Sequence, residues 1–431
     1  MIERYFKLAE HNTTVRQELL GGLTTFMTMA YIIVVNPQIL AQTGMPASGV
    51  LFATCISAAA ASLVMGLYAN YPIALAPGMS LNAYFTYSVC LGMHVPWRTA
   101  LGVIFFSGVL FVLLTVTRIR EQIVNGIPDC LKHSTAAGIG LFIAFVGMRN
   151  AKLIVANPAT FVSIGNFADP QVQAACFGIV LTLILIARQV KGSFLLGILG
   201  ASIFGIARGI SHWPSALVSV PDASSTLLKL DLRGALHLGL IEIIFAFLFV
   251  DLFDNVGTLV AVCEQAGFVR NGKIPGVGKA LLADGVGTIL GSVTGTSTVT
   301  SYIESAAGVA AGARTGLSNV FVAALFLGAV FFAPVAAAIP GFATAPALIL
   351  VGALMTQSIA KINWPDFTDA FPAFVTMAAT PLTFSIATGL SLGVISYSVA
   401  KAGAGKFREI SPVLWILTAL FVLRYVLLAA M

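Results

Sequence analysis

Charged residues are scarce in this chain of 431 residues. Asp, Glu, Lys and Arg together make up 9% of it, whereas hydrophobic residues make up 58%. Because a soluble domain carries about 25% charged residues, a soluble globular protein is excluded. The longest polar stretch, around residues 211–233, is too short for a separate soluble domain. The composition therefore predicts an all-α polytopic membrane protein embedded in the lipid bilayer.

The chain also lacks the signatures of metal, disulfide and nucleotide sites. Its five cysteines show no Cys-x-x-Cys spacing, its five histidines show no metal-ligand spacing, and its glycine-rich stretches do not form a phosphate loop. We therefore expect no metal, no other cofactor and no ATP-driven transport.

The basic residues indicate orientation rather than a nucleic-acid partner. The net charge is +6, and the charges gather at the ends of apolar segments. Most Lys and Arg residues fall on the side of the N-terminus, so the positive-inside rule predicts a cytoplasmic N-terminus. The charged segment at residues 1–20 is too long for a cleaved signal peptide. We expect a multi-pass protein of the cell inner membrane.

Hydropathy predicts about 14 membrane spans. Seven spans repeated once must be inverted in the membrane, and inverted repeats are typical of secondary transporters, whose sites lie at the midplane. The segment 411–429 is either a further span or an interfacial helix. The expected spans lie near residues 17–40, 48–68, 73–92, 98–117, 132–149, 173–188, 192–208, 235–262, 277–294, 296–311, 317–338, 345–360, 367–380 and 383–401.

Spans three and ten contain residues that disfavour helix at mid-membrane depth. Span three has Pro77 and Gly78, and span ten follows Gly295 with the hydroxylic, β-branched run 296–300. Non-helical backbone is tolerated there only against protein or a water-filled cavity. We predict two broken spans, each an extended stretch followed by a half-helix whose N-terminus faces one central cavity. Ordinary kinked helices are the alternative.

Three carboxylates lie within segments apolar enough to span a membrane. Asp251 and Asp254 share a helical face in FLFVDLFDNVGTL, and Glu304 follows in span ten. Each charge at bilayer depth costs about 2.5–3.5 kcal/mol on insertion scales. These acids are therefore the first candidates for a substrate pathway or a proton relay. Hydrogen bonding to a broken span, or capping a half-helix, is the structural alternative.

An amide and a hydroxyl extend the candidate site. Aligning Tyr84 with Tyr302 reveals a weak internal similarity that places Asn82 opposite Thr300. Asn82 offers both a donor and an acceptor, with helix capping as its alternative role. Weaker candidates are aromatic residues that could stack on a ligand and two further acids, namely Tyr84, Phe85, Phe253, Tyr302, Asp284 and Glu242.

Carboxylates, an amide and exposed backbone N–H groups suit a planar, polar, largely neutral ligand with N–H donors and ring acceptors, as in a nucleobase. An anion transporter or exchanger on the same inverted-repeat fold is the alternative, but neither the broken spans nor the acid pair has a Lys or Arg beside it. The Phe-Val-Asp and Leu-Ala-Asp-Gly contexts do not match an intramembrane aspartyl protease, and broken helices favour alternating access over a channel. We expect a transporter, not an enzyme.

With these residues in view, the chain resembles the nucleobase–ascorbate transporter superfamily and, within it, the adenine/guanine/hypoxanthine (azaguanine-type) purine permease branch. The resemblance covers essentially the whole chain. Its most specific motifs are TTVRQELLGGLTTFMTMAYIIVVNPQIL, APGMSLNAYF, VDLFDNVGTL and GTSTVTSYIESAAGVAAGARTGL.

This resemblance implies proton symport of a purine nucleobase, with substrate contacts from Asn82, Asp251, Asp254 and Glu304. It also implies a core domain (1–117 and 235–338) that carries the site. A gate domain (118–234 and 339–401) would provide the surface against which the core moves, and commonly a homodimer contact. Residues 402–431 form an apolar C-terminal segment outside this scheme.

The chain departs from the branch at Ser80, where APGMGLNA or APAMGLNA is usual, and this bears on purine preference. The TSTVTSYIES wording is more similar to adenine-preferring members than to guanine/hypoxanthine ones. For coupling, we expect a buried carboxyl, Glu304 or Asp254, to take up a proton from outside because desolvation favours the neutral acid. The purine then binds, and the neutralised core moves past the gate.

Overall fold

The computed structural model describes residues 2–117, 126–214, 216–220, 222–237, 240–268 and 274–430, without the side chains of residues 241, 242, 253, 256, 260, 424 and 427–430. The chain divides by its contacts into two compact units. Unit 1 comprises Met1–Val116 and Gly147–Leu348, and unit 2 comprises Thr117–Val146 and Ile349–Met431.

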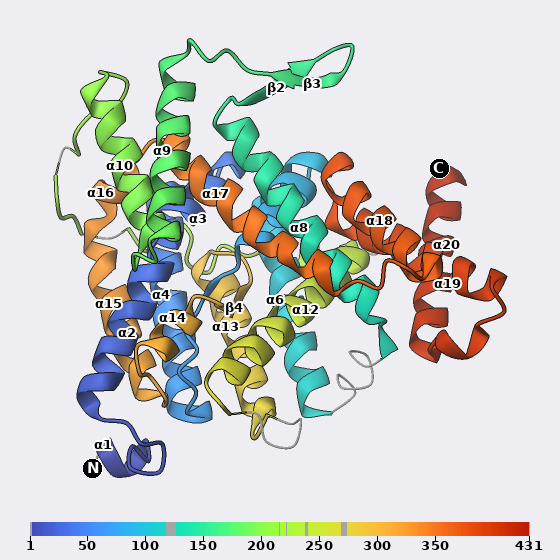
Figure 1. Cartoon of the computed structure of the whole chain (residues 1–431), viewed down its shortest axis with the longest axis horizontal. Helices are drawn as coiled ribbons and strands as arrows, with labels where there is room; N and C mark the ends of the chain where they lie inside the picture. Colours follow the sequence, from blue (N-terminus) through green and yellow to red (C-terminus); the bar gives the residue numbers. More distant parts are fainter. Residues whose placement is uncertain are drawn as a thin grey trace. The chain divides into compact units, whose positions relative to one another are not determined.

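Unit 1 is built mainly of helices, with two antiparallel pairs of short strands (Figure 1). The division between the units falls within the helices α8 (Asp129–Asn150) and α17 (Gly341–Met355). The elements of unit 1 are α1 (Ile2–Tyr5), α2 (Val15–Met29), α3 (Ile32–Leu40), η1 (Ala41–Thr43), α4 (Ala47–Val64), η2 (Met65–Ala69), β1 (Leu75–Pro77), α5 (Met79–Ala83), η3 (Tyr84–Gly92), α6 (Trp97–Val116), β2 (Ile154–Asn157), β3 (Phe161–Ile164), α9 (Pro170–Ala187), α10 (Ser193–Ala207), α11 (Leu232–Ala235), α12 (Ile241–Gln265), α13 (Val277–Thr294), β4 (Val299–Ser301), α14 (Ser305–Ala310), α15 (Leu317–Ala329), η5 (Val330–Phe332) and α16 (Ala333–Ala338).

Eight helical stretches within the described residues are long and apolar enough to cross a membrane. The expected spans three and ten instead contain strands β1 and β4, each followed by a short helix. The chain is thus mostly helical rather than all-α, because these two segments pair their backbone groups with each other. The count of 14 spans stays a prediction. The eight candidates are Val15–Thr43, Ala47–Ala69, Trp97–Val116, Asp129–Asn150, Pro170–Ala187, Ile243–Gln265, Leu317–Ala338 and Gly341–Lys361.

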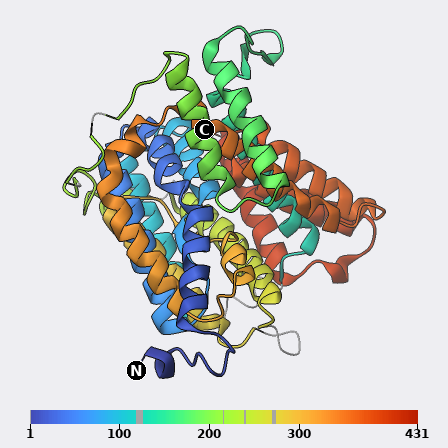
Figure 2. The same ribbon diagram turned by 60° about the vertical axis from the view of Figure 1, so that its left-hand side comes forward.

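Small residues bring the helices of unit 1 into close contact. Helix α15 packs against both α2 and α4, and α2 and α15 run side by side in Figure 2. An added Cβ at Gly316 would lie 2.0 Å from the carbonyl oxygen of Gly66, and one at Gly21 would lie 2.5 Å from Cβ of Ala313. Such approaches replace the hydrophobic driving force that lipid cannot provide between helices.

Unit 2 is held together by α18 (Phe367–Leu382) packed against α19 (Ile386–Gly403), followed by α20 (Pro412–Ala430). It also contains η6 (Thr356–Lys361) and η7 (Phe407–Glu409). Lys401 is 1% exposed, and its Nζ lies 2.9 Å from Asp369 Oδ1 and 2.7 Å from Glu409 Oε2. These carboxylates compensate the buried charge, which would be costly alone.

The expected core segments, 1–117 and 235–338, fall within unit 1, except for Thr117, which belongs to unit 2. The expected gate segments, 118–234 and 339–401, are divided between the units, since 147–234 has most of its contacts in unit 1. A division by contacts does not report which parts move, so the core and gate domains stay predictions.

A buried carboxylate on α2 provides a test of this packing. Glu18 is 0% exposed, and its side-chain oxygens accept hydrogen bonds from the backbone N–H groups of Arg314 (2.8 Å), Thr315 (3.1 Å) and Ser318 (3.2 Å). Glu18→Ala leaves these donors without their partner, so we expect the free energy of unfolding to fall by about 1–3 kcal/mol or more. Thermal unfolding in detergent measures this. The exposed Glu10→Gln serves as the control, and equal melting temperatures for the two variants would contradict the role of Glu18.

Candidate functional site

Strands β1 and β4 form a buried two-stranded antiparallel ladder in the middle of unit 1. Ala76 pairs with Thr300 at its centre, and all six residues of the two strands are buried. The pairing is extended at both ends, because Gly78 N–H donates to the Thr298 carbonyl (2.9 Å) and Tyr302 N–H donates to the Ala74 carbonyl (3.0 Å). Two segments far apart in the sequence thereby satisfy each other's backbone groups.

Each strand of the ladder leads directly into a helix. β1 is followed by α5 and η3, and β4 is followed by α14. Helix α12, which carries the acid pair, contacts β4, α14 and α5. The ladder therefore brings Asn82, Thr300 and Glu304 into the same neighbourhood as Asp251 and Asp254.

Glu304 lies in the turn between β4 and α14, at the N-cap position of α14. Its side chain makes no capping hydrogen bond. It instead accepts a hydrogen bond at Oε1 from the hydroxyl of Tyr31, at 2.7 Å, and is half-buried. Tyr31 is 1% exposed and lies between α2 and α3. The side chain of Glu304 is thus oriented by a neighbouring segment rather than by its own helix.

Asp254 is also held by a hydroxyl from another element. Its Oδ2 accepts a hydrogen bond from Ser80 Oγ on α5, at 3.2 Å, and the side chain is half-buried. The serine at position 80, where the purine permease branch usually has glycine, therefore provides a hydrogen-bond donor to Asp254. Helix α12, β1–α5–η3 and β4–α14 contain no Lys or Arg, so these acids have no basic partner on those elements.

Asn82 and Thr300 are buried, and each has a polar atom for which the described residues supply no hydrogen-bond partner. Asn82 is 0% exposed; its Oδ1 accepts from the Ser297 hydroxyl, while its Nδ2 has no partner. The Oγ1 of Thr300 has none either, and its methyl group lies over Gly78, 2.7 Å from where a Cβ would stand. Because buried polar groups are normally satisfied, these two unpartnered atoms are exceptions and mark Asn82 and Thr300 as candidates for a functional role.

The remaining candidates are more deeply buried or lie outside the described residues. Asp251 is 1% exposed on α12, one turn before Asp254, and Asp284 is 0% exposed on α13. The side chains of Glu242 and Phe253 lie outside the described residues. Among the candidate acids whose side chains the structure describes, Asp254 and Glu304 are thus the two that are partly accessible.

The expected aromatic residues make packing contacts around the ladder. The ring of Tyr84 lies 4.9 Å from that of Phe247, and Phe85 is 0% exposed. The hydroxyl of Tyr302 donates to the Pro77 carbonyl at 2.6 Å. Stacking of a ligand on these rings stays a prediction.

The internal alignment of Tyr84 with Tyr302 is wrong in register. Tyr302 directly follows β4, whereas Tyr84 follows β1 and the whole of α5. The alignment compared residue types only, and these carry no information on the strand pairing, in which Ala76 lies opposite Thr300.

Sequence reasoning missed Tyr31, Ser297 and Asn36 as partners of the site. Asn36 Nδ2 donates to Thr54 Oγ1 (2.7 Å) and Thr296 Oγ1 (2.8 Å), which ties α3 and α4 to the segment that leads into β4. A polar residue inside the apolar run AYIIVVNPQIL was the available signal.

The hydrogen bond from Tyr302 to Pro77 allows a test of the ladder. Tyr302→Phe leaves the buried Pro77 carbonyl without this donor, so we expect a loss of about 1–3 kcal/mol in the free energy of unfolding. Thermal unfolding in detergent measures the change. Tyr68→Phe, on an exposed ring, is the matched control. An unchanged melting temperature for Tyr302→Phe would show that the bond does not stabilise the ladder.

Sequence comparisons find known proteins that resemble this chain along nearly its whole length. Residues 16–392 match a model of the Permease family (Xan_ur_permease). A protein of Methanocaldococcus jannaschii named as a permease is 54% identical over 99% of both chains. The adenine permease AdeP of Escherichia coli is 44% identical over 100% of this chain and 97% of its own. The guanine/hypoxanthine permease PbuO of Bacillus subtilis is 43% identical over 98% of this chain and 100% of its own.

Two solved structures share the fold at low sequence identity. The transmembrane domain of the cyanobacterial bicarbonate transporter BicA has a TM-score of 0.66 and 16% identity, covering 88% of this chain and 97% of that one. The murine anion transporter Slc26a9 in its inward-facing state has a TM-score of 0.63 and 11% identity, covering 90% and 68%. The sequence matches identify the group more closely: the chain is a multi-pass membrane protein of the Permease family and belongs to the purine permease branch of the nucleobase–ascorbate transporters.

Proposed function

We propose that this protein takes up purine nucleobases across the inner membrane by proton-coupled alternating access, with its N-terminus in the cytoplasm. The observation that carries the proposal is the gathering of Asp254, Glu304 and Asn82 around the β1–β4 ladder. Relatives that are named for adenine and for guanine/hypoxanthine match at nearly equal identity, 44% and 43%. Adenine is the purine we favour.

The chemistry of the site supports a neutral purine over an anion. Carboxylate oxygens of Asp254 and Glu304 would accept from purine N–H groups, and the unpaired Nδ2 of Asn82 would donate to a ring nitrogen. An anion would meet two acids and no Lys or Arg on the elements that carry them. Although anion transporters share this fold, these elements provide no basic side chain that could bind an anion. Asp251 and Thr300 complete the proposed substrate contacts from deeper positions.

Proton coupling follows from the cost of moving these acids. An ionised carboxylate is far more costly than a neutral acid in a low-dielectric environment. In the proposed cycle Glu304 or Asp254 takes up a proton, the purine binds, and the core domain moves past the gate domain and releases both inside. Contacts between gate domains would form a homodimer.

Substitution of the two acids tests the proposal. We expect Asp254→Asn and Glu304→Gln each to reduce uptake of labelled adenine into proteoliposomes by about tenfold or more, because each removes a charged hydrogen-bond acceptor. An inward proton gradient should raise the initial rate in the unsubstituted protein. Glu264→Gln, an exposed acid at the end of α12, is the matched control.

Several outcomes would contradict the proposal. Uptake that is indifferent to the proton gradient and to both acid substitutions would rule out the mechanism. Competition of sulfate or bicarbonate against adenine, with no competition among purines, would favour the anion transporter instead.

The hydroxyl on Asp254 gives a second test. A purine that bonds Asp254 competes with Ser80 for the carboxylate, so we expect both Ser80→Ala and Ser80→Gly to lower the adenine concentration for half-maximal uptake. The expected change is about fivefold, which corresponds to one hydrogen bond of ~1 kcal/mol. Initial rates over a concentration series measure this. If only Ser80→Gly lowers the concentration for half-maximal uptake, the effect comes from the space taken by Cβ and not from the hydroxyl. The proposed competition is then wrong.

A further inference from the structure

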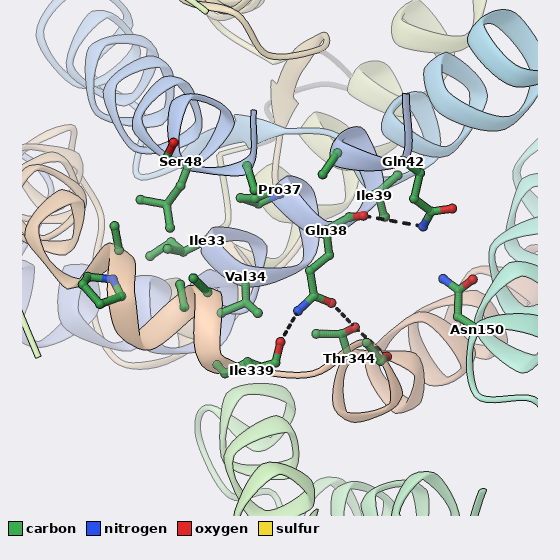
Figure 3. A pocket seen from close by; sticks show the side chains of 18 of the residues that line it. Ile33, Val34, Pro37, Gln38, Ile39, Gln42, Ser48, Asn150, Ile339 and Thr344 are labelled. Carbon is green, nitrogen blue, oxygen red and sulfur yellow. Dashed lines mark hydrogen bonds between the residues drawn. The ribbon is translucent and has the colours of Figure 1, made fainter. Parts of the chain in front are cut away.

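Unit 1 contains a cavity of about 730 Å³. Figure 3 shows its lining side chains. The cavity is lined by α3, η1, the start of α4, α16 and the start of α17, together with Asn150 and Ser219. None of the five proposed substrate-binding residues lines it. Its volume falls within the range of about 300–1,000 Å³ that is usual for small-molecule sites.

The lining of this cavity suits an uncharged ligand. The described side chains that line it are aliphatic or neutral polar, and none of them is charged or aromatic. The described lining residues offer no counter-charge to a charged ligand. The aliphatic walls, which include Ile33, Val34 and Leu51, provide apolar contact for the faces of a flat ring.

Three carboxamides supply the main polar groups, and one of them is fully engaged. Gln38 Nε2 donates to the Ile339 carbonyl at 2.6 Å, and its Oε1 accepts from the Thr344 hydroxyl at 2.6 Å (Figure 3). Gln38 is therefore a fixed part of the wall that ties α3 to the start of α17.

The other two carboxamides have unused acceptors. Gln42 Nε2 donates to the hydroxyl of Tyr87 at 2.9 Å, and Asn150 Nδ2 donates to the same hydroxyl at 3.4 Å. These bonds occupy amide N–H groups, and no described residue donates to Gln42 Oε1 or Asn150 Oδ1. The two side chains lie near each other at one end of the cavity (Figure 3). That end thus offers two hydrogen-bond acceptors held by one shared anchor.

Two helical segments connect the cavity with the candidate site, one that lines the cavity and one that anchors two of its lining side chains. Val34 and Gln38 line the cavity on α3, and Tyr31, which bonds Glu304, immediately precedes that helix. Tyr31 and Gln38 are seven residues apart, about 10 Å along a helix. Tyr87, the anchor of the carboxamides, follows Asn82 by five residues in the continuous helical run of α5 and η3.

From this geometry we infer that the cavity is a second, weaker binding site for the neutral purine, where the nucleobase rests before it reaches the acids. The inference rests on the proposed function. Amino and ring N–H groups of a purine match the free oxygens of Gln42 and Asn150, because a carboxamide oxygen can accept from the amino group of adenine. An alkyl chain would fill the aliphatic walls but would leave both oxygens unused.

Binding stoichiometry tests the second site. Equilibrium dialysis of the purified full-length protein with labelled adenine should reveal two sites per chain, one weaker than the other. The double variant Asp254→Asn/Glu304→Gln should retain the weaker site, and Gln42→Leu/Asn150→Leu should retain only the tighter one. Tyr87→Phe, which keeps the ring but removes the shared anchor, should weaken the second site by about fivefold.

Transport kinetics provide the second measurement. Gln42→Leu should raise the adenine concentration for half-maximal uptake by about fivefold, while the tight site keeps its affinity in dialysis. Gln357→Leu, on an exposed side chain without an assigned role, is the matched control. One adenine per chain in the unsubstituted protein, or loss of all binding in the double acid variant, would overturn the second site.

The outcomes also separate this inference from the proposed function. Absence of any adenine uptake by the unsubstituted protein would contradict the proposed function. Normal uptake with a single binding site would contradict only the inference of a second site. Displacement of the weaker adenine by low concentrations of an alkyl detergent that does not affect the tight site would identify the cavity as a lipid site and overturn the inference.

Discussion

The pairing of β1 with β4 is the interaction on which the rest of unit 1 depends. Inside a bilayer, each unsatisfied backbone N–H or C=O costs several kcal/mol, so a non-helical segment needs a partner. Leu75–Pro77 and Val299–Ser301 are that partner for each other. The same pairing sets the start of α5 and the turn before α14, and so determines where Asn82 and Glu304 stand beside α12. Without the ladder, no backbone pairing would hold the polar residues of these two distant segments close together.

Beside the ladder, hydroxyl groups donate hydrogen bonds to the two partly accessible acids. Tyr31 bonds one oxygen of Glu304, and Ser80 bonds one oxygen of Asp254, each from a different element. A neutral O–H donor stabilises a carboxylate less than a Lys or Arg would. This matters for transport, because an acid locked in a buried ion pair would neither take up a proton readily nor release its partner to a substrate. Each of these hydroxyls engages one carboxylate oxygen.

Much of this was predictable from residue types, and the failures have a common cause. Pro77, Gly78 and Gly295 lie where the structure leaves helix for extended backbone, and Gly295 has a φ of +103° that side chains rarely tolerate. That these segments are broken membrane spans stays a prediction. The burial of Asp251 and of Asn82 also followed from their apolar surroundings. The strand register, the partners Tyr31 and Ser297, and the cavity beside Gln42 did not follow. Each depends on contacts between distant segments, and hydropathy and local propensity carry no information about those.

The fold leaves the choice of ligand to a few side chains. Transporters that are named for bicarbonate and for anions share this architecture at 16% and 11% identity, so the architecture alone selects no substrate. Helix starts that face a cavity provide partial positive charge, which favours an anion when nothing opposes it. Here Glu304 stands at the start of α14, and Asp254 bonds Ser80 in the first turn of α5. Negative side chains at both starts would offset that field, which is consistent with the neutral base and the proton of the proposed function.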